Sequence, residues 1–322
     1  MVAQPLAGCA VAVAEQAGAA TIGPDLARPG RALLIVNQKA RSGQDQAEAA
    51  LAALRGAGLE AEAFEMPEGM ACAEAVVQGT APGGFDRVVL GGGDGTLNAA
   101  IPGLLRAGLP FGILPLGTAN DLARSLGIPL ELEGAAQVIA TAAARPVDLG
   151  EVNGHAFFNV ASIGFSAELA EELKSDSKKR FGKLGYAVAA LGLLRRARPF
   201  SVELLHDGRV ERVRTIQVSV GNGKHHGGGM TVAEDARPDD GMLDVYSLEV
   251  THWWQLVALL PWLRRGTQGQ WRDVRAFRTT ELELRTRRQR PVNTDGELTT
   301  HTPAVFRLRP AALRVFAPAR EA

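Results

Sequence analysis

The sequence has little cysteine and no surplus of charge of either sign. Cysteine occurs only at positions 9 and 72, too few for a disulfide framework or a cysteine-based metal cluster. Lys plus Arg equals Asp plus Glu, at 35 each, so the charge balance gives no reason to expect a nucleic-acid partner. The longest strongly apolar run, Trp253 to Leu263, contains Gln255 and Pro261. It is shorter than the roughly 20 apolar residues that span a membrane, and we expect a cytoplasmic protein.

The length of the chain and the change in its pattern of expected strands and helices near residue 145 predict two domains after a short extension. The chain has 322 residues, enough for two separate cores. Residues 1–30 are rich in Ala and Gly and predict a mobile N-terminal extension. Residues 31–144 alternate strands with helices, which predicts an α/β domain with a parallel sheet covered on both faces. Residues 145–322 predict a mainly antiparallel β-sandwich, whose last residues are expected to pack back on the first domain.

Hydrophobic periodicity and turn residues set the expected elements. In the first domain we expect strands at 32–36, 59–64, 87–90 and 111–114, and helices at 44–57, at 72–78 and from Thr96 onward. Pro102 is expected to kink or shorten the last of these helices. In the second domain we expect strands at 146–152, 155–161, 202–205, 212–220, 243–248, 281–285 and 304–308, and helices at 167–173, 184–196 and 252–263.

The stretch from Arg87 to Asn98 is the most informative part of the sequence. An aliphatic strand runs into three glycines, an aspartate and a fourth glycine, and Thr96 is placed to cap the helix that follows. Glycines let a ligand lie against bare amides, and amides at a helix N-terminus attract phosphate. Asp94 fits such a site if a divalent cation or a water stands between its carboxylate and the phosphate. The alternative is an ordinary tight turn between strand and helix.

A second glycine turn follows the next strand, within Pro115 to Arg124. Thr118 and Asp121 have the spacing of a shortened capping box, which alone would explain the pattern. The functional interpretation is a second amide cradle beside the first, with Gly117 permitting close approach and Thr118 and Asn120 offering polar groups to a nucleotide. The predicted nucleotide-binding residues are Asn37, Gly92, Gly93, Asp94, Gly95, Thr96, Asn98, Gly117, Thr118 and Asn120.

Two histidines and an acidic turn stand out in the second half. No third nitrogen or sulfur ligand lies at a recognisable spacing from His225 and His226, so we expect an exposed loop pair rather than a metal site. The turn from Ala236 to Asp244 can hold a hard cation through carboxylate and carbonyl oxygens, or it is an ordinary turn that leads into a strand.

The last motif runs from Asn293 to Glu297. Its Asp-Gly pair is also common in hairpin turns. Asp295 and Glu297 lie on opposite sides of one glycine, so one carboxylate could face a metal and the other a substrate hydroxyl. A positioned carboxylate is the base that phosphoryl transfer to an alcohol uses.

These motifs together resemble the diacylglycerol kinase catalytic-domain family, in particular its soluble bacterial lipid kinases. The resemblance runs from about Arg31 to Val315. Its carriers, in family order, are Gly92–Asn98, Leu114–Arg124, Gly221-Asn222 with Gly227–Met230, Asp240–Asp244 and Asp295–Glu297. It implies an ATP-binding α/β domain and a β-sandwich domain with the active site in the cleft between them.

The resemblance also implies roles for particular residues. Gly92 to Thr96 would hold the phosphates of ATP, and Gly117 and Thr118 would face the nucleotide. A structural Mg²⁺ would be bound by the Asp240 carboxylate with carbonyls near Arg237 and Met242. Glu297 would act as general base. The implied activity is an ATP- and Mg-dependent lipid kinase that acts on diacylglycerol or a related lipid.

Two other functions compete with this one. NAD kinases and phosphofructokinases share the Gly-Gly-Asp-Gly-Thr turn, but Leu114–Arg124 and the later motifs favour a lipid kinase. A non-catalytic nucleotide sensor is the other alternative. The joint presence of Asp94, Asp240 and Glu297 argues against it, because a sensor need not keep a base.

A lipid kinase without a spanning helix must meet its substrate at a bilayer surface, so we expect peripheral membrane association. Basic residues gather at Lys174, Lys178, Lys179, Arg180 and Lys183, and again at Arg195, Arg196 and Arg198. Trp253, Trp254 and Trp262 lie in an apolar segment that ends in Arg264 and Arg265. A solvated helix face would explain the basic run. We favour a helix packed on the sandwich for the Trp segment. A homodimer is compatible with the sequence.

Overall fold

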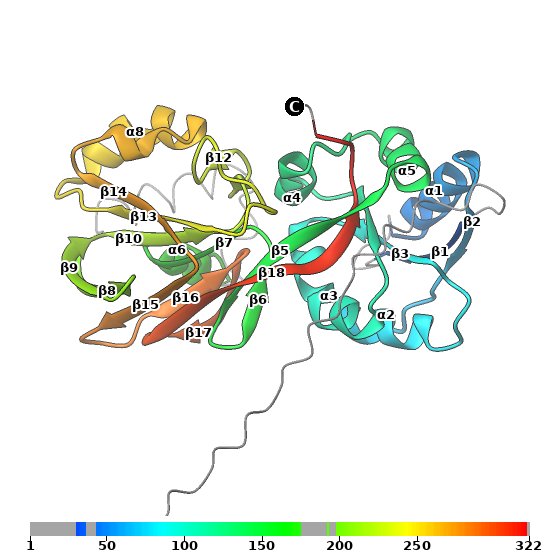
Figure 1. The fold of residues 1–322 in the computed structure, drawn as a ribbon, viewed down its shortest axis with the longest axis horizontal. Coiled ribbons are helices and arrows are strands. Elements are labelled where there is room, and N and C mark those ends of the chain that lie inside the picture. The colour runs from blue at the N-terminus through cyan, green and yellow to red at the C-terminus, as the bar shows by residue number, and fades with distance from the viewer. Residues whose placement is uncertain (1–29, 37–42, 175–191, 193–197, 321–322) are drawn as a thin grey trace, which may run out of the picture.

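The computed structural model describes residues 30–36, 43–174, 192 and 198–320. The chain forms two lobes, and the long strands β5 (Ala144–Val152) and β18 (Ala304–Phe316) run between them (Figure 1). Asn37, residues 1–29 and the basic residues 178–183 and 195–196 lie outside the described residues. The helix expected at 184–196 also lies outside them, except for Gly192.

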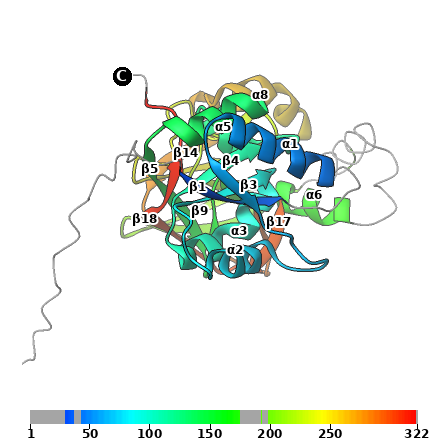
Figure 2. The same ribbon diagram turned by 90° about the vertical axis from the view of Figure 1, so that its right-hand side faces the viewer.

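The first lobe alternates strands and helices. Its elements are β1 (Arg31–Val36), α1 (Gly43–Gly56), β2 (Glu60–Ala63), α2 (Cys72–Thr80), β3 (Arg87–Gly92), α3 (Asp94–Ala107), β4 (Phe111–Pro115), α4 (Asp121–Ser125) and α5 (Leu132–Thr141). The four strands are parallel in the order β2-β1-β3-β4. Helices α1 and α5 cover one face of this sheet, and α2 and α3 cover the other (Figure 2). Because both faces are covered, β1, β3 and β4 are almost continuously apolar and buried.

The second lobe is a sandwich of antiparallel strands. Its further elements are β6 (His155–Phe157), β7 (Val160–Gly164), α6 (Phe165–Lys174), β8 (Phe200–His206), β9 (Arg209–Thr215), β10 (Gln217–Gly221), β11 (His225–His226), β12 (Met230–Thr231), β13 (Leu243–Leu248), α8 (Trp253–Arg265), η2 (Gln268–Gln270), β14 (Val274–Thr279), β15 (Glu281–Thr286), β16 (Pro291–Thr294) and β17 (Glu297–His301). A six-stranded sheet, β14-β13-β10-β7-β16-β17, packs on strands that include β8, β15 and β18. The predicted fold class, a parallel α/β domain followed by an antiparallel sandwich, is confirmed.

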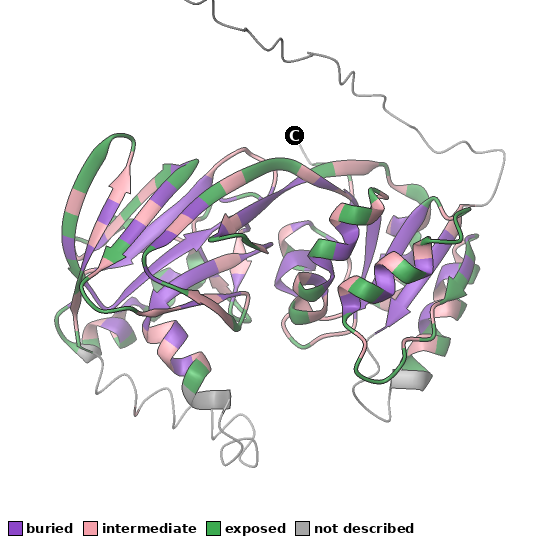
Figure 3. Ribbon diagram, turned by 90° about the horizontal axis from the view of Figure 1, so that it is seen from below, coloured by how far each residue is buried: buried purple, intermediate pink, exposed green. Residues whose placement is uncertain are grey.

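One sheet passes through both lobes, which the sequence did not indicate. The order β2-β1-β3-β4-β18-β15-β8-β9 is continuous, and β18 joins β4 in parallel where Val315 lies opposite Phe111. The end of β18 therefore belongs to the first core, where Leu313, Val315 and Phe316 are buried. Figure 3 shows that β18 is buried toward its two ends, one in each lobe, and exposed along the middle that crosses between them. The two lobes are thus tied by backbone hydrogen bonds as well as by side-chain packing.

Some element boundaries differ from the predicted ones. Helix α3 begins at Asp94, not Thr96, because the carbonyl of Gly93 already accepts the N–H groups of Thr96 and Leu97. Pro102 lies inside this helix but does not end it, because the helix continues to Ala107. The apolar runs expected as single strands at 155–161 and 212–220 are each divided between two strands, β6 and β7 in the first case and β9 and β10 in the second.

Candidate active site

The two glycine turns lie side by side because β3 and β4 are paired in parallel. Gly93 precedes α3 and Gly117 follows β4. A Cβ atom on Gly117 would overlap the Cα of Gly93, and a Cβ on Gly93 would lie 3.0 Å from the Cα of Gly117. These two glycines are therefore needed for contact between the two backbones. By contrast, a Cβ on Gly95 would meet no atom within 4 Å, so the first turn of α3 is open toward a ligand.

The carboxylate of Asp94 ties the two turns together. It accepts hydrogen bonds from the backbone N–H groups of Asp121 and Leu122, both at 3.0 Å. The side-chain amide of Asn159 is a third donor, at 3.4 Å. Asp94 thus caps the N-terminus of α4, a role that Thr118 was expected to have. The N–H groups of Asp94 and Gly95 have no intrahelical acceptor and remain the donors that can bind a phosphate.

Asn120 shapes the second turn rather than pointing a free amide at a ligand. Its backbone is left-handed, with φ of 52°. Its Oδ1 accepts the N–H of Gly117 at 3.0 Å, and its Nδ2 donates to the carbonyls of Gly117 and Pro115. The neighbouring Thr118 side chain is exposed. Of the polar groups predicted in this turn, Thr118 is the one that the structure presents to solvent.

The remaining predicted nucleotide residues are placed differently. The Thr96 side chain packs directly over Gly92, whose missing Cβ makes room for it. The Oδ1 atom of Asn98 is buried and has no hydrogen-bond partner among the described residues. Asn37 lies outside the described residues, so the structure does not place it.

Asp295 and Glu297 have different surroundings. Both carboxylate oxygens of Asp295 accept backbone N–H groups, from Phe158 at 2.8 Å, Asn159 at 3.1 Å and Val160 at 2.9 Å. Burial raises the pKa of Asp295 to about 7, although the three N–H donors act in the opposite direction. Glu297 is exposed, and no hydrogen bond to its carboxylate occurs among the described residues. The carboxylate of Asp295 is thus held by the backbone, and Asp295 lines the large cavity described below, whereas Glu297 is exposed and is not among the residues that line it.

The acidic turn from Ala236 to Asp244 is hydrogen-bonded to the long strand β5 through the side chain of Asp148. It also carries a buried carboxylate oxygen that has no hydrogen-bond partner among the described residues. Asp240 accepts the N–H of Met242 at 3.1 Å and forms an ion pair with Arg278, which also pairs with Asp244 at 3.1 Å. Burial raises the pKa of Asp244 to about 6, and its Oδ2 has no hydrogen-bond partner in the described residues. Arg237, the third predicted residue, is exposed. Nowhere in the described segments do three His, Cys, Asp or Glu side chains form a metal-holding group.

A cavity of about 1190 Å³ opens beside the glycine turns. One part of its wall carries three carboxylates, those of Asp94, Asp121 and Asp295. Another part is apolar and comes from α6 and α8, with Phe165, Leu169, Leu256, Val257, Leu260 and Leu263. The cavity therefore offers acidic and backbone groups at one end and a hydrocarbon-like wall at the other, which suits an amphiphilic molecule.

Asp121 and His226 were not predicted as site residues. Asp121 was treated only as part of a capping pattern, yet its Oδ1 is buried, unpartnered among the described residues and in the cavity wall. Burial, followed by the nearby charge of Asp94, raises the pKa of Asp121. The expectation that both histidines lie in an exposed loop is wrong. They form β11, in which His225 is half-buried and His226 is buried beside the hydroxyl of Tyr246 at 3.3 Å. Because β11 has only two residues, no local pattern signalled this burial.

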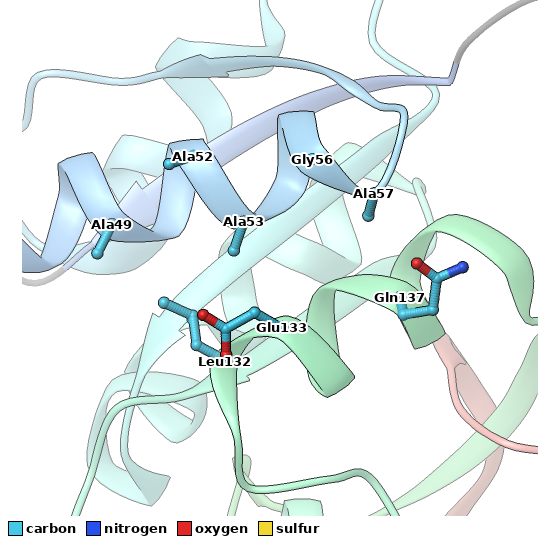
Figure 4. A pocket seen from close by; sticks show the side chains of 8 residues that line it. All are labelled: Ala49, Ala52, Ala53, Gly56, Ala57, Leu132, Glu133 and Gln137. Atoms are coloured by element: carbon cyan, nitrogen blue, oxygen red, sulfur yellow. The ribbon is translucent and has the colours of Figure 1, made fainter.

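A smaller hollow of about 520 Å³ lies between α1 and α5 (Figure 4). Its lining is Ala49, Ala52, Ala53, Gly56 and Ala57 from α1, and Leu132, Glu133 and Gln137 from α5. None of these residues belongs to a glycine turn or to the larger cavity, and the small side chains simply leave the two helices incompletely packed.

Helix α8 is packed on the sandwich, as predicted. Leu256, Leu259 and Leu263 are its residues in the buried cluster, whereas Trp254 is 55% exposed and Trp262 packs edge-on against Trp271. None of the helices that the structure describes has the length and apolar character needed to span a bilayer.

Comparisons with known proteins agree over nearly the whole chain. The model of the diacylglycerol kinase catalytic domain matches residues 31–152. The model described as the YegS C-terminal NAD kinase beta sandwich-like domain matches residues 159–317. A Pseudomonas aeruginosa protein named probable lipid kinase YegS-like is 37% identical over 297 residues, which cover 90% of this chain and 95% of that protein.

Two further matches carry the name diacylglycerol kinase. The Bacillus subtilis (strain 168) protein is 31% identical over 225 residues, 69% of this chain and 74% of that protein. A crystal structure of a diacylglycerol kinase from Bacillus anthracis str. Sterne superposes with a TM-score of 0.74 at 27% identity. The superposition covers 89% of this chain and 97% of that one.

Proposed function

We propose that this chain, which belongs to the diacylglycerol kinase catalytic-domain family, transfers the γ-phosphoryl group of ATP to a hydroxyl group of a lipid. The observation that carries the proposal is the cavity that joins the phosphate-type turn at Asp94 to the apolar wall made by α6 and α8. A phosphoryl donor and a hydrocarbon-bearing acceptor can meet there.

The nucleotide side is supported by the open first turn of α3. Its free amides point out of a helix of 14 residues, and the partial positive charge of the helix end favours phosphate oxygens. Asp94 and Asn120 hold this turn and its neighbour in fixed positions, so the donors need little reorganisation when a phosphate binds. Thr118, exposed beside them, is available to the nucleotide.

The chemical step requires a base for the acceptor hydroxyl. In our proposal Glu297 takes that proton while the lipid oxygen forms a bond to the γ-phosphorus, and the bond from the γ-phosphorus to the oxygen bridging it to the β-phosphate breaks. ADP leaves with that bridging oxygen. Asp295 holds the backbone of Phe158 to Val160 and lines the cavity, and Glu297 lies two residues further on.

Mg²⁺ fits the residues present at the acidic turn. Asp240 and Asp244 both pair with Arg278, and the Oδ2 of Asp244 is buried without a partner among the described residues. Hard oxygen donors are what Mg²⁺ prefers. Asp240, with carbonyls near Arg237 and Met242, would hold the ion. When bound, Mg²⁺ supplies positive charge that stabilises this turn between the two lobes.

The alternatives predict a different use of the cavity. NAD and sugar phosphates have no hydrocarbon chain to place against the apolar wall of Phe165, Leu169 and Leu260. Burial of such a wall is favourable when an apolar group covers it. A nucleotide sensor would have no use for an acceptor cavity. The lipid kinase therefore accounts for more of the site than either alternative.

The direct test is a transfer assay. The full-length protein is incubated with γ-labelled ATP, Mg²⁺ and a total lipid extract, and the labelled product is identified. We expect a labelled lipid with the parent protein and labelling at least about 10²-fold slower with Glu297→Gln. Label in NAD or in a soluble sugar phosphate, with none in lipid, would overturn the lipid assignment.

We also propose that the chain meets its lipid at a bilayer surface through α8. Val257 and Leu260 are 51% and 42% exposed and also line the cavity, so the apolar wall continues onto the surface of the helix. Trp254 is exposed nearby, and Arg264 and Arg265 follow at its C-terminal end. Tryptophan beside arginine suits the headgroup region of an anionic leaflet.

A further inference from the structure

Strand β10 has a polar face that is buried although it lies outside the sandwich core. Its residues alternate as Gln217, Val218, Ser219 and Val220, a pattern that normally places the polar side chains in water. Val218 and Val220 are in the sandwich core as expected. Gln217 and Ser219, however, are only 8% and 0% exposed. The face that should be wet is covered, and both residues line the large cavity.

The neighbouring strands continue this polar surface. Ser219 lies directly opposite Ser162 of β7 on one side and Tyr246 of β13 on the other. We call the following set the polar row: Ser162, Ser166, Gln217, Ser219, His226 and Tyr246. All six line the cavity, together with its three carboxylates and the apolar side chains of α6 and α8. Gly164 of β7 lies opposite Gln217.

Hydrogen bonds hold the row in place. Ser166 and Ser162 share a hydroxyl hydrogen bond of 2.7 Å, and Gln217 Nε2 donates to Ser219 Oγ at 2.8 Å. Gln217 Oε1 accepts the backbone N–H of Ser166 at 3.2 Å. Tyr246 contacts His226 Nε2 at 3.3 Å.

These bonds leave hydroxyl protons that a ligand can accept. One proton is enough for the Ser162–Ser166 pair, so the second hydroxyl of the pair can donate elsewhere. Ser219 accepts from Gln217, and its hydroxyl also hydrogen-bonds to that of Tyr246, so the Ser162–Ser166 pair is the part of the row that keeps a proton for a ligand. Burial lowers the pKa of His226 to about 4, so the row is uncharged near neutral pH. It therefore suits neutral hydrogen-bond acceptors rather than a phosphate or an ammonium group.

The row also lies at a defined place along the cavity. Asn159, next to Asp94, and Ser162 are three residues apart around the start of β7, about 10 Å along an extended chain. The row thus begins within about 10 Å of the carboxylate end. In a glycerolipid, neutral acceptor oxygens occur between the terminal hydroxyl and the hydrocarbon chains, as the carbonyls of the ester links.

Resting on the lipid kinase function proposed above, we infer that the polar row binds the ester carbonyl oxygens of a glycerolipid acceptor and selects ester-linked over ether-linked lipids. A site built to hydrogen-bond a group discriminates against the analogue without it. An ether lipid has the same hydroxyl and hydrocarbon chains but lacks both carbonyls.

The experiment compares matched ester and ether acceptors with the full-length protein. The probes are dioleoyl and dioleyl-ether glycerol, and the corresponding pair of phosphatidylglycerols, in mixed micelles with saturating Mg-ATP. We expect kcat/KM to favour the ester lipid of the accepted pair by about 10-fold or more. Ser219→Ala and Tyr246→Phe should each reduce that preference by roughly 5- to 10-fold and leave KM for ATP unchanged.

Ser247→Ala is the matched control. Ser247 is as buried as Ser219 and lies on the adjacent strand β13, but it does not line the cavity. Its hydroxyl has no partner among the described residues, so the variant should fold and keep the ester preference. Equal rates on ester and ether lipids, or a preference that Ser247→Ala lowers as much as Ser219→Ala, would overturn the inference alone. Phosphorylation of none of the four lipids, while a lipid in the total extract is labelled, would overturn the inference alone. No labelled lipid in either assay would overturn the proposed function and the inference with it.

Discussion

The carboxylate of Asp94 accepts the backbone N–H of Asp121 at 3.0 Å, although the two residues are 27 positions apart and follow different strands. This bond, with the one from Leu122, makes the first residue of α3 the cap of α4. The two phosphate-type turns therefore form one unit. A change at Asp94 should affect both the fold and the chemistry.

The first prediction concerns this bond. Asp94→Ala should abolish phosphoryl transfer and lower the free energy of unfolding by about 1–3 kcal/mol, because two helix amides lose a charged acceptor. Asp94→Asn retains one acceptor oxygen and should lose less stability. Denaturant unfolding and the transfer assay measure the two effects. An Asp94→Ala protein of parent stability would show that the cap is energetically unimportant.

We predict that Gly117 is needed for the fold, whereas Gly95 is needed for phosphate binding. Gly117→Ala places a Cβ against the backbone of Gly93 and should destabilise the protein by roughly 1–3 kcal/mol. Gly95→Val has free space and should preserve the fold, yet its side chain would cover the open amides and weaken Mg-ATP binding. Thermal unfolding and calorimetric titration separate the two. Parent-like ATP affinity in Gly95→Val would move the phosphate site away from α3.

Glu297→Gln should keep the fold and the affinity for ATP but reduce kcat by about 10²–10⁴-fold, the usual contribution of a positioned base. Because Glu297 is exposed, the Glu297→Gln protein should have the melting temperature of the parent. Asp295→Asn is the comparison, since it exchanges the acceptor of three backbone N–H groups and should lower the melting temperature. Near-normal turnover of Glu297→Gln would assign the proton to another group.

The acidic turn should give a pH signature. Burial raises the pKa of Asp244 to about 6 from an ordinary value of 3.8. The folded chain then binds more protons than the unfolded chain between these values, so this residue makes the free energy of unfolding fall as pH rises through that window. Asp244→Asn should remove this residue's part of the fall in denaturant unfolding measured across pH, and Mg²⁺ should oppose that part. The part due to Asp295, whose pKa burial also raises, to about 7, should remain.

Added Mg²⁺ should also raise the melting temperature of the parent at pH 7 but not that of Asp240→Ala, since only an ion bound to the folded state stabilises it. Chelation by EDTA should reverse the gain. Equal stabilisation of the parent and Asp240→Ala would place the ion elsewhere.

Vesicle co-sedimentation tests α8. Trp254→Ala, and separately the pair Arg264→Glu and Arg265→Glu, should weaken binding to vesicles that contain phosphatidylglycerol, the charge pair by at least about 10-fold at low salt, given about 1 kcal/mol for each basic residue. Val210→Ser is the control, because Val210 is also an exposed apolar residue but lies on β9. Loss of binding in Val210→Ser to the same extent would indicate nonspecific adsorption, and unchanged binding in the α8 variants would exclude this helix.

Much of the first domain could be predicted from local sequence. Aliphatic runs such as Ala32 to Val36 and the helix stop at Gly108 are decided by residues near one another in the chain. The turn at Gly93 was also evident, because strand, glycines and helix start are contiguous. The roles of its members were not. Gly93 and Gly117 contact each other only because β3 and β4 are paired.

The sequence by itself determined the alternation of β10 and so the two faces of that strand. Only the tertiary structure decided that both faces are buried, because α6 and α8 cover the side that carries Gln217 and Ser219. In the same way, the sequence showed that α8 is apolar but not which of its side chains face the sandwich, because leucine and tryptophan are similarly apolar. The packing of the helix against residues of β13 places its leucines in the buried cluster. The continuous sheet depends on β18 meeting β4 at Val315 and Phe111. Such pairings join residues about 200 positions apart, and no local pattern encodes them.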